Sequence, residues 1–129
     1  METAVLGFVG SKNIGDYIQT KAVIDIIDSK KTRILDRENL DKYNEDEIKT
    51  IINGWFMENP KNWPPSNKII PLFISFHINP SARGELLKKE SLEYLKKHEP
   101  IGCRDHYTRD ILIEKGIKAY YSSCVTTSL

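Results

Sequence analysis

The sequence predicts one α/β domain in which a parallel sheet is covered by helices. The chain has 129 residues, of which 40% are hydrophobic and 29% are charged, as expected for one folded globular domain. Short apolar runs alternate with segments of helical period from one end to the other. The runs are continuously apolar instead of alternating with period two, which is typical of parallel strands buried on both faces.

The first strand is expected at residues 4–9, where an apolar run precedes a turn-rich segment. An amphipathic helix is predicted over residues 16–31, because apolar side chains recur there at helical spacing and Asp16 can cap its start. A short strand is expected at residues 32–36. The charged segment that follows lacks apolar periodicity, so we expect it at the surface.

A third strand is predicted at residues 48–53, ended by Asn53 and Gly54. The segment 55–67 contains three prolines and two tryptophans, and it is expected to be an irregular loop outside the core. Residues 69–77 form the strongest strand candidate by composition. Pro71 is expected to weaken its first part or to place that part outside the ladder.

The C-terminal part continues the alternation. A helix is predicted over residues 84–98, with a possible break near Ser91, and a short strand over residues 100–103. A further helix is expected at residues 105–115, with Asp105 as its N-cap, and a last strand at residues 117–122.

Composition excludes several functional classes. The net charge of +1 and the pI of about 7.7 argue against nucleic acid as a partner. The longest apolar runs are far shorter than the roughly 20 residues that a membrane span needs. The N-terminus lacks the features of a signal peptide, and the two cysteines have no framework spacing, so we expect a cytoplasmic protein.

The glycines after the first strand do not form a nucleotide-binding motif. Their offsets do not match the dinucleotide fingerprint, and Asp16-Tyr17 stands where a P-loop needs Lys-Ser/Thr. A helix N-terminus with Asn13 and Asp16 remains, and its free N–H groups could receive an anion or a hydroxyl. The simpler alternative is that Asp16 only caps the helix.

Two further polar residues lie at the ends of predicted strands. His77 lies at the end of the strongest strand, where a general acid or base is expected, although a hydrogen-bonded core histidine is the simpler interpretation. Arg104 could bind a carboxylate or phosphate, or it could pair with Asp105 or Asp110.

The aromatic and sulfur-containing residues have simpler interpretations. Trp55 and Trp63 could present flat faces to sugar rings, but such residues more often anchor a long loop. Cys103 and Cys124 have no metal-binding or catalytic spacing and are interpreted as small core residues. No metal site is predicted.

Six ordered sequence blocks carry a resemblance to one family. They are Asn13-Ile14-Gly15-Asp16, Ile52-Asn53-Gly54-Trp55-Phe56-Met57, Trp63-Pro64-Pro65-Ser66, Phe73-Ile74-Ser75-Phe76-His77-Ile78, Pro100-Ile101-Gly102-Cys103-Arg104-Asp105 and Ser123-Cys124-Val125-Thr126-Thr127-Ser128-Leu129. Together they resemble the N-terminal half of polysaccharide pyruvyl transferases. Those enzymes transfer the pyruvyl group of phosphoenolpyruvate onto two hydroxyls of a sugar in cell-surface polysaccharide biosynthesis.

The resemblance implies a Rossmann-like lobe, residues 1–129, of a GT-B-like arrangement in which the site lies between two lobes. The family's basic and histidine contacts to phosphoenolpyruvate belong to a C-terminal lobe, so a second lobe or partner chain is expected. A non-catalytic remnant or binding module is the alternative, and a glycosyltransferase-like lobe with another donor is less well supported. No cofactor is implied beyond the donor substrate.

The resemblance also implies roles for individual residues. Asn13 and Asp16 match the family's N-x-G-D block, and Arg104 with Asp105 matches its R-D block. The chemistry needs a base for the attacking hydroxyl, so Asp16, His77 and Asp105 are the catalytic candidates. Substrate binding is expected from Asn13, Asn53, Trp55 and Arg104.

Overall fold

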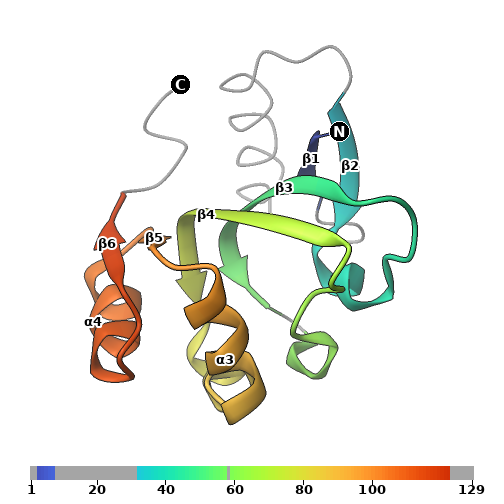
Figure 1. Ribbon diagram of the computed structural model, residues 1–129. Helices are drawn as coiled ribbons and strands as arrows, with labels where there is room; N and C mark the ends of the chain where they lie inside the picture. The colour runs from blue at the N-terminus through green and yellow to red at the C-terminus, as the bar shows by residue number, and fades with distance from the viewer. Residues whose placement is uncertain (1–2, 8–31, 58, 123–129) are drawn as a thin grey trace.

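A computed structural model describes residues 3–7, 32–57 and 59–122, and six parallel strands form one sheet within them (Figure 1). The strands are β1 (Thr3–Gly7), β2 (Thr32–Asp36), β3 (Ile48–Phe56), β4 (Ile69–Ile78), β5 (Ile101–Cys103) and β6 (Ala119–Tyr121). Their order across the sheet is β2-β1-β3-β4-β5-β6. The predicted α/β architecture with a parallel sheet is therefore confirmed.

Because all neighbouring strands pair in parallel, the carboxyl ends of all six strands lie at one edge of the sheet. From β1 the chain runs outward to β2, returns to pair β3 with β1, and then continues in the other direction to β6. The order thus reverses between β1 and β3. In open parallel sheets, ligands bind outside the carboxyl edge at such a reversal.

An irregularity between the central strands β3 and β4 shapes this edge. The register passes from the pair Ile52–Phe73 to the pair Gly54–Phe76, so β4 contains one extra residue. Ser75 adopts a positive φ of 54° at this bulge and donates its N–H to Ser122 Oγ over 2.9 Å. Phe73 and Phe76 would face opposite ways in a regular strand, but the bulge lets both contact Trp63.

The core is built around an aromatic cluster on one face of the sheet. Its members are Phe56, Trp63, Phe73, Phe76 and Tyr94, with ring centroids 5.0–6.4 Å apart in the contacting pairs. Trp63 is only 2% exposed. The expectation that its segment lies outside the core is wrong, because this tryptophan anchors the segment in the core.

The described helices complete this core. They are the 3₁₀ helices η1 (Arg37–Lys42), η2 (Pro60–Asn62) and η3 (Pro80–Ala82) and the α-helices α2 (Arg83–Leu86), α3 (Lys89–Lys97) and α4 (His106–Glu114). Leu95 of α3 and Leu112 of α4 are fully buried in the core, and both helices lie on the same side of the sheet (Figure 1). The helix predicted at residues 16–31 lies outside the described residues.

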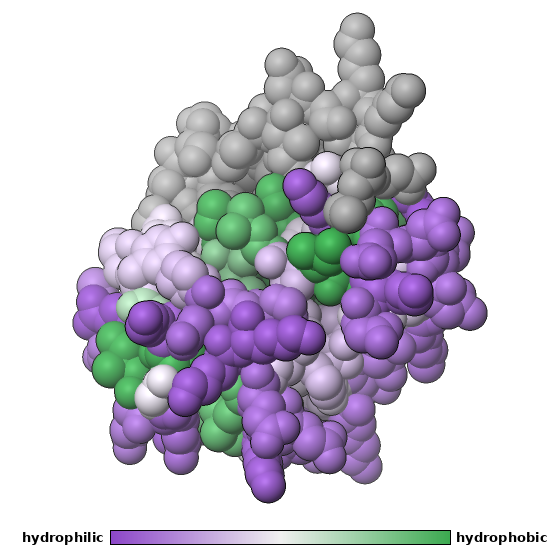
Figure 2. Space-filling view, viewed as in Figure 1, coloured by the Kyte–Doolittle hydropathy of each residue, from purple (hydrophilic) through white to green (hydrophobic). Residues whose placement is uncertain are grey.

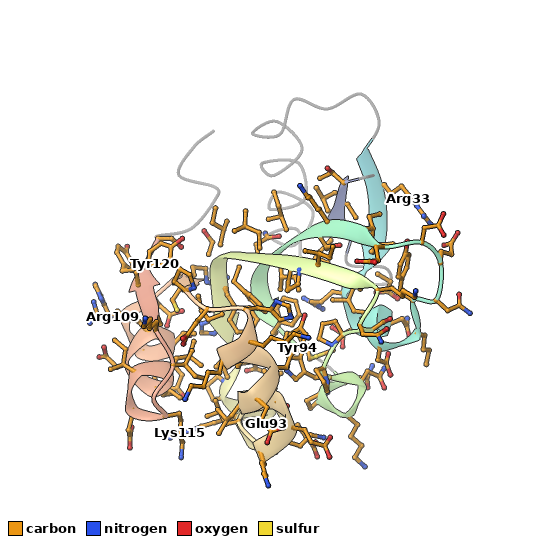
Figure 3. All side chains as sticks on the ribbon, in the orientation of Figure 1. Arg33, Glu93, Tyr94, Arg109, Lys115 and Tyr120 are labelled. Carbon is orange, nitrogen blue, oxygen red and sulfur yellow. The ribbon has the colours of Figure 1, made fainter. Side chains whose placement is uncertain are left out.

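The outer surface of α3 is polar. Figure 2 shows hydrophilic side chains over the outer face of α3, whereas Tyr94, labelled in Figure 3, belongs to the buried aromatic cluster. This division follows from the amphipathic pattern of α3, whose Leu95 is buried. None of the helices in the described ranges is long and apolar enough to cross a bilayer.

Two predictions about the central strands need correction. Strand β3 continues through Gly54, which has a φ of 83°, to Phe56, because glycine tolerates this conformation within the strand. Pro71 lies inside the ladder, opposite Thr50. Proline removes only one N–H donor there, and the neighbouring pairs on both sides remain formed.

Two further corrections concern the charged segment after β2 and the break between α2 and α3. Arg37 and Glu38 are buried, although their segment was expected at the surface, and their side chains form an ion pair of 2.5 Å. The break between α2 and α3 lies at Leu87 and Lys88 instead of near Ser91. The hydroxyl of Ser91 donates to the Glu85 carbonyl over 2.7 Å and so joins the two helices.

Candidate active site at the carboxyl edge

Strands β4, β5 and β6 end in register and bring three polar residues to one edge of the sheet. Phe76 pairs with Cys103, and Cys103 pairs with Tyr121. The next residues along these strands are His77, Arg104 and Ser122. The Arg104 N–H donates to the Phe76 carbonyl over 2.9 Å, and the Ser122 N–H donates to the Cys103 carbonyl over 2.8 Å. The backbones of His77 and Arg104 therefore lie next to each other at this edge.

His77 and Asp105 form a hydrogen-bonded pair at this edge. The Nδ1 atom of His77 contacts Oδ2 of Asp105. The other oxygen of Asp105, Oδ1, accepts the Thr108 N–H over 2.8 Å and caps α4, as predicted. Both carboxylate oxygens are therefore engaged, whereas the His77 side chain remains 16% exposed.

Thr108 connects the end of β4 to the start of α4. Its side chain is fully buried, and its Oγ1 accepts the Ile78 N–H over 3.1 Å. The same atom lies 3.4 Å from Nδ1 of His77. The histidine ring is therefore held from β4 by its own backbone and from α4 by Asp105 and Thr108.

The electrostatics of Asp105 favour its ionised form. Desolvation by burial would raise the pKa of this carboxyl, but the Thr108 backbone N–H, the His77 ring and the Thr108 hydroxyl together outweigh it and hold the pKa below the ordinary value of 3.8. The pair at neutral pH therefore contains a carboxylate, which accepts hydrogen bonds and donates none.

Arg104 brings a positive charge to the same edge of the sheet, since its backbone N–H donates to the carbonyl of Phe76, the residue before His77. Its side chain is half-buried, and it makes no hydrogen bond or ion pair with any residue in the described part of the chain. The sequence left open a pairing with Asp105 or Asp110, but Asp105 contacts His77 and Asp110 pairs with Arg109. Its planar guanidinium can therefore bind a carboxylate or phosphate.

The remaining predicted substrate-binding residues have different outcomes. Asn53 lies in β3 opposite the bulge, is 1% exposed, and its Nδ2 has no hydrogen-bond partner among the described residues. Trp55 is the ladder partner of His77, which puts its backbone next to the site. The predictions for Asn13 and Asp16 fall outside the described residues.

Cys103 and the possible metal ligands were also considered as candidates for chemistry. Cys103 is fully buried, and burial raises the pKa of its thiol to about 12, which agrees with a core residue and not with a nucleophile. Cys124 lies outside the described residues. Within the described ranges, no group of three or more histidine, cysteine, aspartate or glutamate side chains could hold a metal ion.

Sequence reasoning missed Thr108 and Ser122. Thr108 lies three residues after the N-cap Asp105, a spacing at which a side chain can reach back to the cap, so the signal was available. Ser122 Oγ accepts the Ser75 N–H at the bulge and donates to the Cys103 carbonyl over 3.3 Å. No local pattern reveals that contact, since the two serines are 47 residues apart.

The assembled site can perform two chemical tasks. His77 can take or give a proton at the ring nitrogen that is not in contact with Asp105, and Arg104 can bind an anion next to it. Both groups come from the ends of neighbouring strands, so one ligand at the carboxyl edge could meet both.

Comparison with known families identifies the family of the chain. The family model for polysaccharide pyruvyl transferase matches residues 13–129, which is most of the chain and includes both His77 and Arg104. No curated protein and no solved structure gives a significant match. The chain therefore belongs to the polysaccharide pyruvyl transferase family.

Proposed function

We propose that this chain provides the sugar-binding side of a pyruvyl transferase that converts phosphoenolpyruvate and a sugar diol into a cyclic ketal and phosphate. The observation that carries the proposal is the His77–Asp105 pair at the carboxyl edge. A sugar hydroxyl needs a base to become a nucleophile, and a histidine oriented by a carboxylate is a common solution.

The proposed reaction defines what the site has to supply. One hydroxyl oxygen attacks C2 of the enol, and C3 takes a proton and becomes a methyl group. The second hydroxyl then displaces phosphate at C2 and closes the ring. Of the two hydroxyl protons released, one balances the proton gained at C3 and the other leaves with phosphate. His77 accepts a hydroxyl proton, and Arg104 binds an anionic group of the donor.

The two anionic groups of the donor are the reason to propose a second lobe. Phosphoenolpyruvate carries a carboxylate and a phosphate, and both need cationic or hydrogen-bonding partners. Of the described residues that directly follow a strand, Arg37 and Arg104 are basic, and Arg37 is buried in its ion pair with Glu38. Arg104 alone is too little for two anionic groups, so we assign the remaining donor contacts to a second, GT-B-like lobe.

The biological setting follows from the same proposal. An enzyme that uses phosphoenolpyruvate and sugar acceptors for cell-surface polysaccharide would act in the cytoplasm, where this glycolytic donor is made. We propose lipid-linked or polymeric saccharides as the acceptors.

The test is a transfer assay with the full chain. Phosphoenolpyruvate is incubated with galactose-, mannose- and glucose-type acceptors, with and without the C-terminal lobe of a pyruvyl transferase. Phosphate release is followed by a colorimetric assay, and the ketal methyl group by NMR. Ketal formation that needs this chain would support the proposal. Acceptor binding without any transfer, even with an authentic lobe, would replace it with a non-catalytic binding module.

A further inference from the structure

We propose that Asp105 and Thr108 are positioning residues that hold His77 as the Nδ1–H tautomer, so that Nε2 is the atom that exchanges a proton with the ligand. This inference deepens the proposed function, on which its catalytic part rests. It also revises the role expected for Asp105, which becomes a residue that acts through His77.

The tautomer follows from the partner of Nδ1. The carboxylate of Asp105 accepts hydrogen bonds and cannot donate one, so the contact between Nδ1 and Oδ2 requires the proton on Nδ1. In the neutral ring the lone pair is then on Nε2. The nitrogen that contacts Asp105 is thereby excluded as the base.

The hydroxyl of Thr108 reinforces this assignment. Its Oγ1 already accepts the Ile78 N–H, so its own proton is free for a second partner. Two acceptors are nearby, the Asp105 carboxylate and Nδ1 of His77, but Nδ1 already carries a proton. The hydroxyl therefore donates to Asp105 and supports its ionised, accepting state.

Asp105 is a weaker base than His77. Its Oδ1 caps α4 through the Thr108 N–H and its Oδ2 holds the histidine, and these hydrogen bonds hold the pKa of the carboxyl below its ordinary value, so it has little tendency to take a proton from a hydroxyl. When Nε2 accepts a proton, the imidazolium gains an adjacent negative charge at Asp105. The pair thus separates proton transfer, done by His77, from orientation and charge balance, done by Asp105.

The first experiment reads the tautomer directly and needs no catalytic activity. Long-range ¹H–¹⁵N correlation NMR distinguishes the two nitrogens of the neutral His77 ring in the uniformly labelled chain. The wild type is expected to show the proton on Nδ1. In Asp105→Asn the side-chain amide can donate to Nδ1, which moves the proton to Nε2. Asparagine is an equally good N-cap, so this variant should keep α4, as circular dichroism can verify.

The second set of variants tests Thr108. Thr108→Ser keeps the hydroxyl, whereas Thr108→Val removes it at nearly constant volume; both should keep the proton on Nδ1, because the Asp105 carboxylate still accepts it. In the transfer assay, Asp105→Asn should lower kcat by about 100-fold or more and Thr108→Val by about tenfold, with Thr108→Ser near wild type. Asp110→Asn is the matched control, since this exposed residue on the same helix pairs with Arg109.

The outcomes separate this inference from the proposed function. A wild-type ring protonated on Nε2, or a tautomer unchanged in Asp105→Asn, would overturn the inference. The expected tautomers together with no ketal formation by any lobe combination would refute the proposed function and leave the positioning of the ring established.

Discussion

Asp105 performs a structural task and an electrostatic task with a single side chain. One oxygen caps α4 and the other holds His77, and three hydrogen-bond partners keep its carboxyl ionised. Because both tasks depend on the same charge, a change at Asp105 should affect folding stability and the histidine together.

The stability effect has a defined direction with pH. The folded-state pKa of Asp105 lies below its ordinary value of 3.8, so its charge stabilises the fold above that value and this stabilisation is lost as the pH falls through the folded pKa. Asp105→Ala should cost about 1 kcal/mol of unfolding free energy at pH 7, as expected for a lost N-cap, and less at pH 3. Urea unfolding at the two pH values measures both numbers.

Asp110→Ala provides the comparison for this prediction. Asp110 is exposed and pairs with Arg109 at the surface, so its loss should change stability by less than about 0.5 kcal/mol at either pH. A penalty for Asp105→Ala that is as large at pH 3 as at pH 7 would show that the charge does not contribute to the cap.

The positions of individual site residues could be predicted where they depend only on neighbouring residues in the sequence. Asp105 as an N-cap follows from its position before a helical pattern, and His77 and Arg104 follow from their positions after strands. The hydrogen bond between His77 and Asp105 was not predictable, because 28 residues separate them and only the packing of α4 on β4 brings them together. The positive φ of Ser75 has no local signal either, since serine rarely adopts it.

At the scale of elements, β5 is confined between its neighbours at Gly102. A Cβ atom at this position would lie 2.8 Å from the Phe73 carbonyl oxygen and 2.9 Å from the Tyr120 hydroxyl. Tyr120 of β6 lies at the outer end of the sheet in Figure 3. Strand β5 can lie this close to β4 and β6 only because Gly102 has no side chain.

This confinement predicts opposite outcomes for two glycine substitutions. Gly102→Ala should destabilise the chain by about 1–3 kcal/mol, because the backbone carbonyl cannot move away as a flexible side chain could. Gly84→Ala should stabilise it by about 0.5–1 kcal/mol, since this residue lies in α2 and nothing comes within 4 Å of the added methyl group. Thermal or urea unfolding of both variants tests the pair. A neutral Gly102→Ala would mean that β5 can shift outward.

The elements themselves were largely predictable from the apolar runs. All six strands overlap the predicted ranges, because buried parallel strands leave continuous apolar segments. The extension of β3 through Gly54 was missed, since asparagine followed by glycine usually marks a turn. The burial of Arg37 and Glu38 was also missed, because charge suggests solvent unless the ion pair that compensates it is known.

At the scale of the whole molecule, the strand order could not be predicted. Patterns along the chain identify strands but not their neighbours, and the reversal between β1 and β3 appears only in the sheet. The candidate site lies at the same carboxyl edge as that reversal, but at the neighbouring strand ends of β4, β5 and β6.

The proposed second lobe leads to a prediction about the activity of this chain on its own. With Arg104 as the unpaired basic residue among the described strand ends, the chain alone should bind phosphoenolpyruvate weakly at most and release no phosphate above background. Addition of the C-terminal lobe of a pyruvyl transferase should restore release in the presence of an acceptor sugar. Calorimetry and the phosphate assay test the two parts. Robust turnover by the chain alone would refute the need for a second lobe.

The most direct measurement of the central claim compares two histidine variants in the transfer assay. His77→Gln removes the proposed base and should lower the rate of ketal formation by about 100-fold or more. His98→Gln is the control, because His98 precedes the amino end of β5, at the opposite edge of the sheet, and should leave the rate within about twofold. Equal rates for His77→Gln and the wild type would contradict the account.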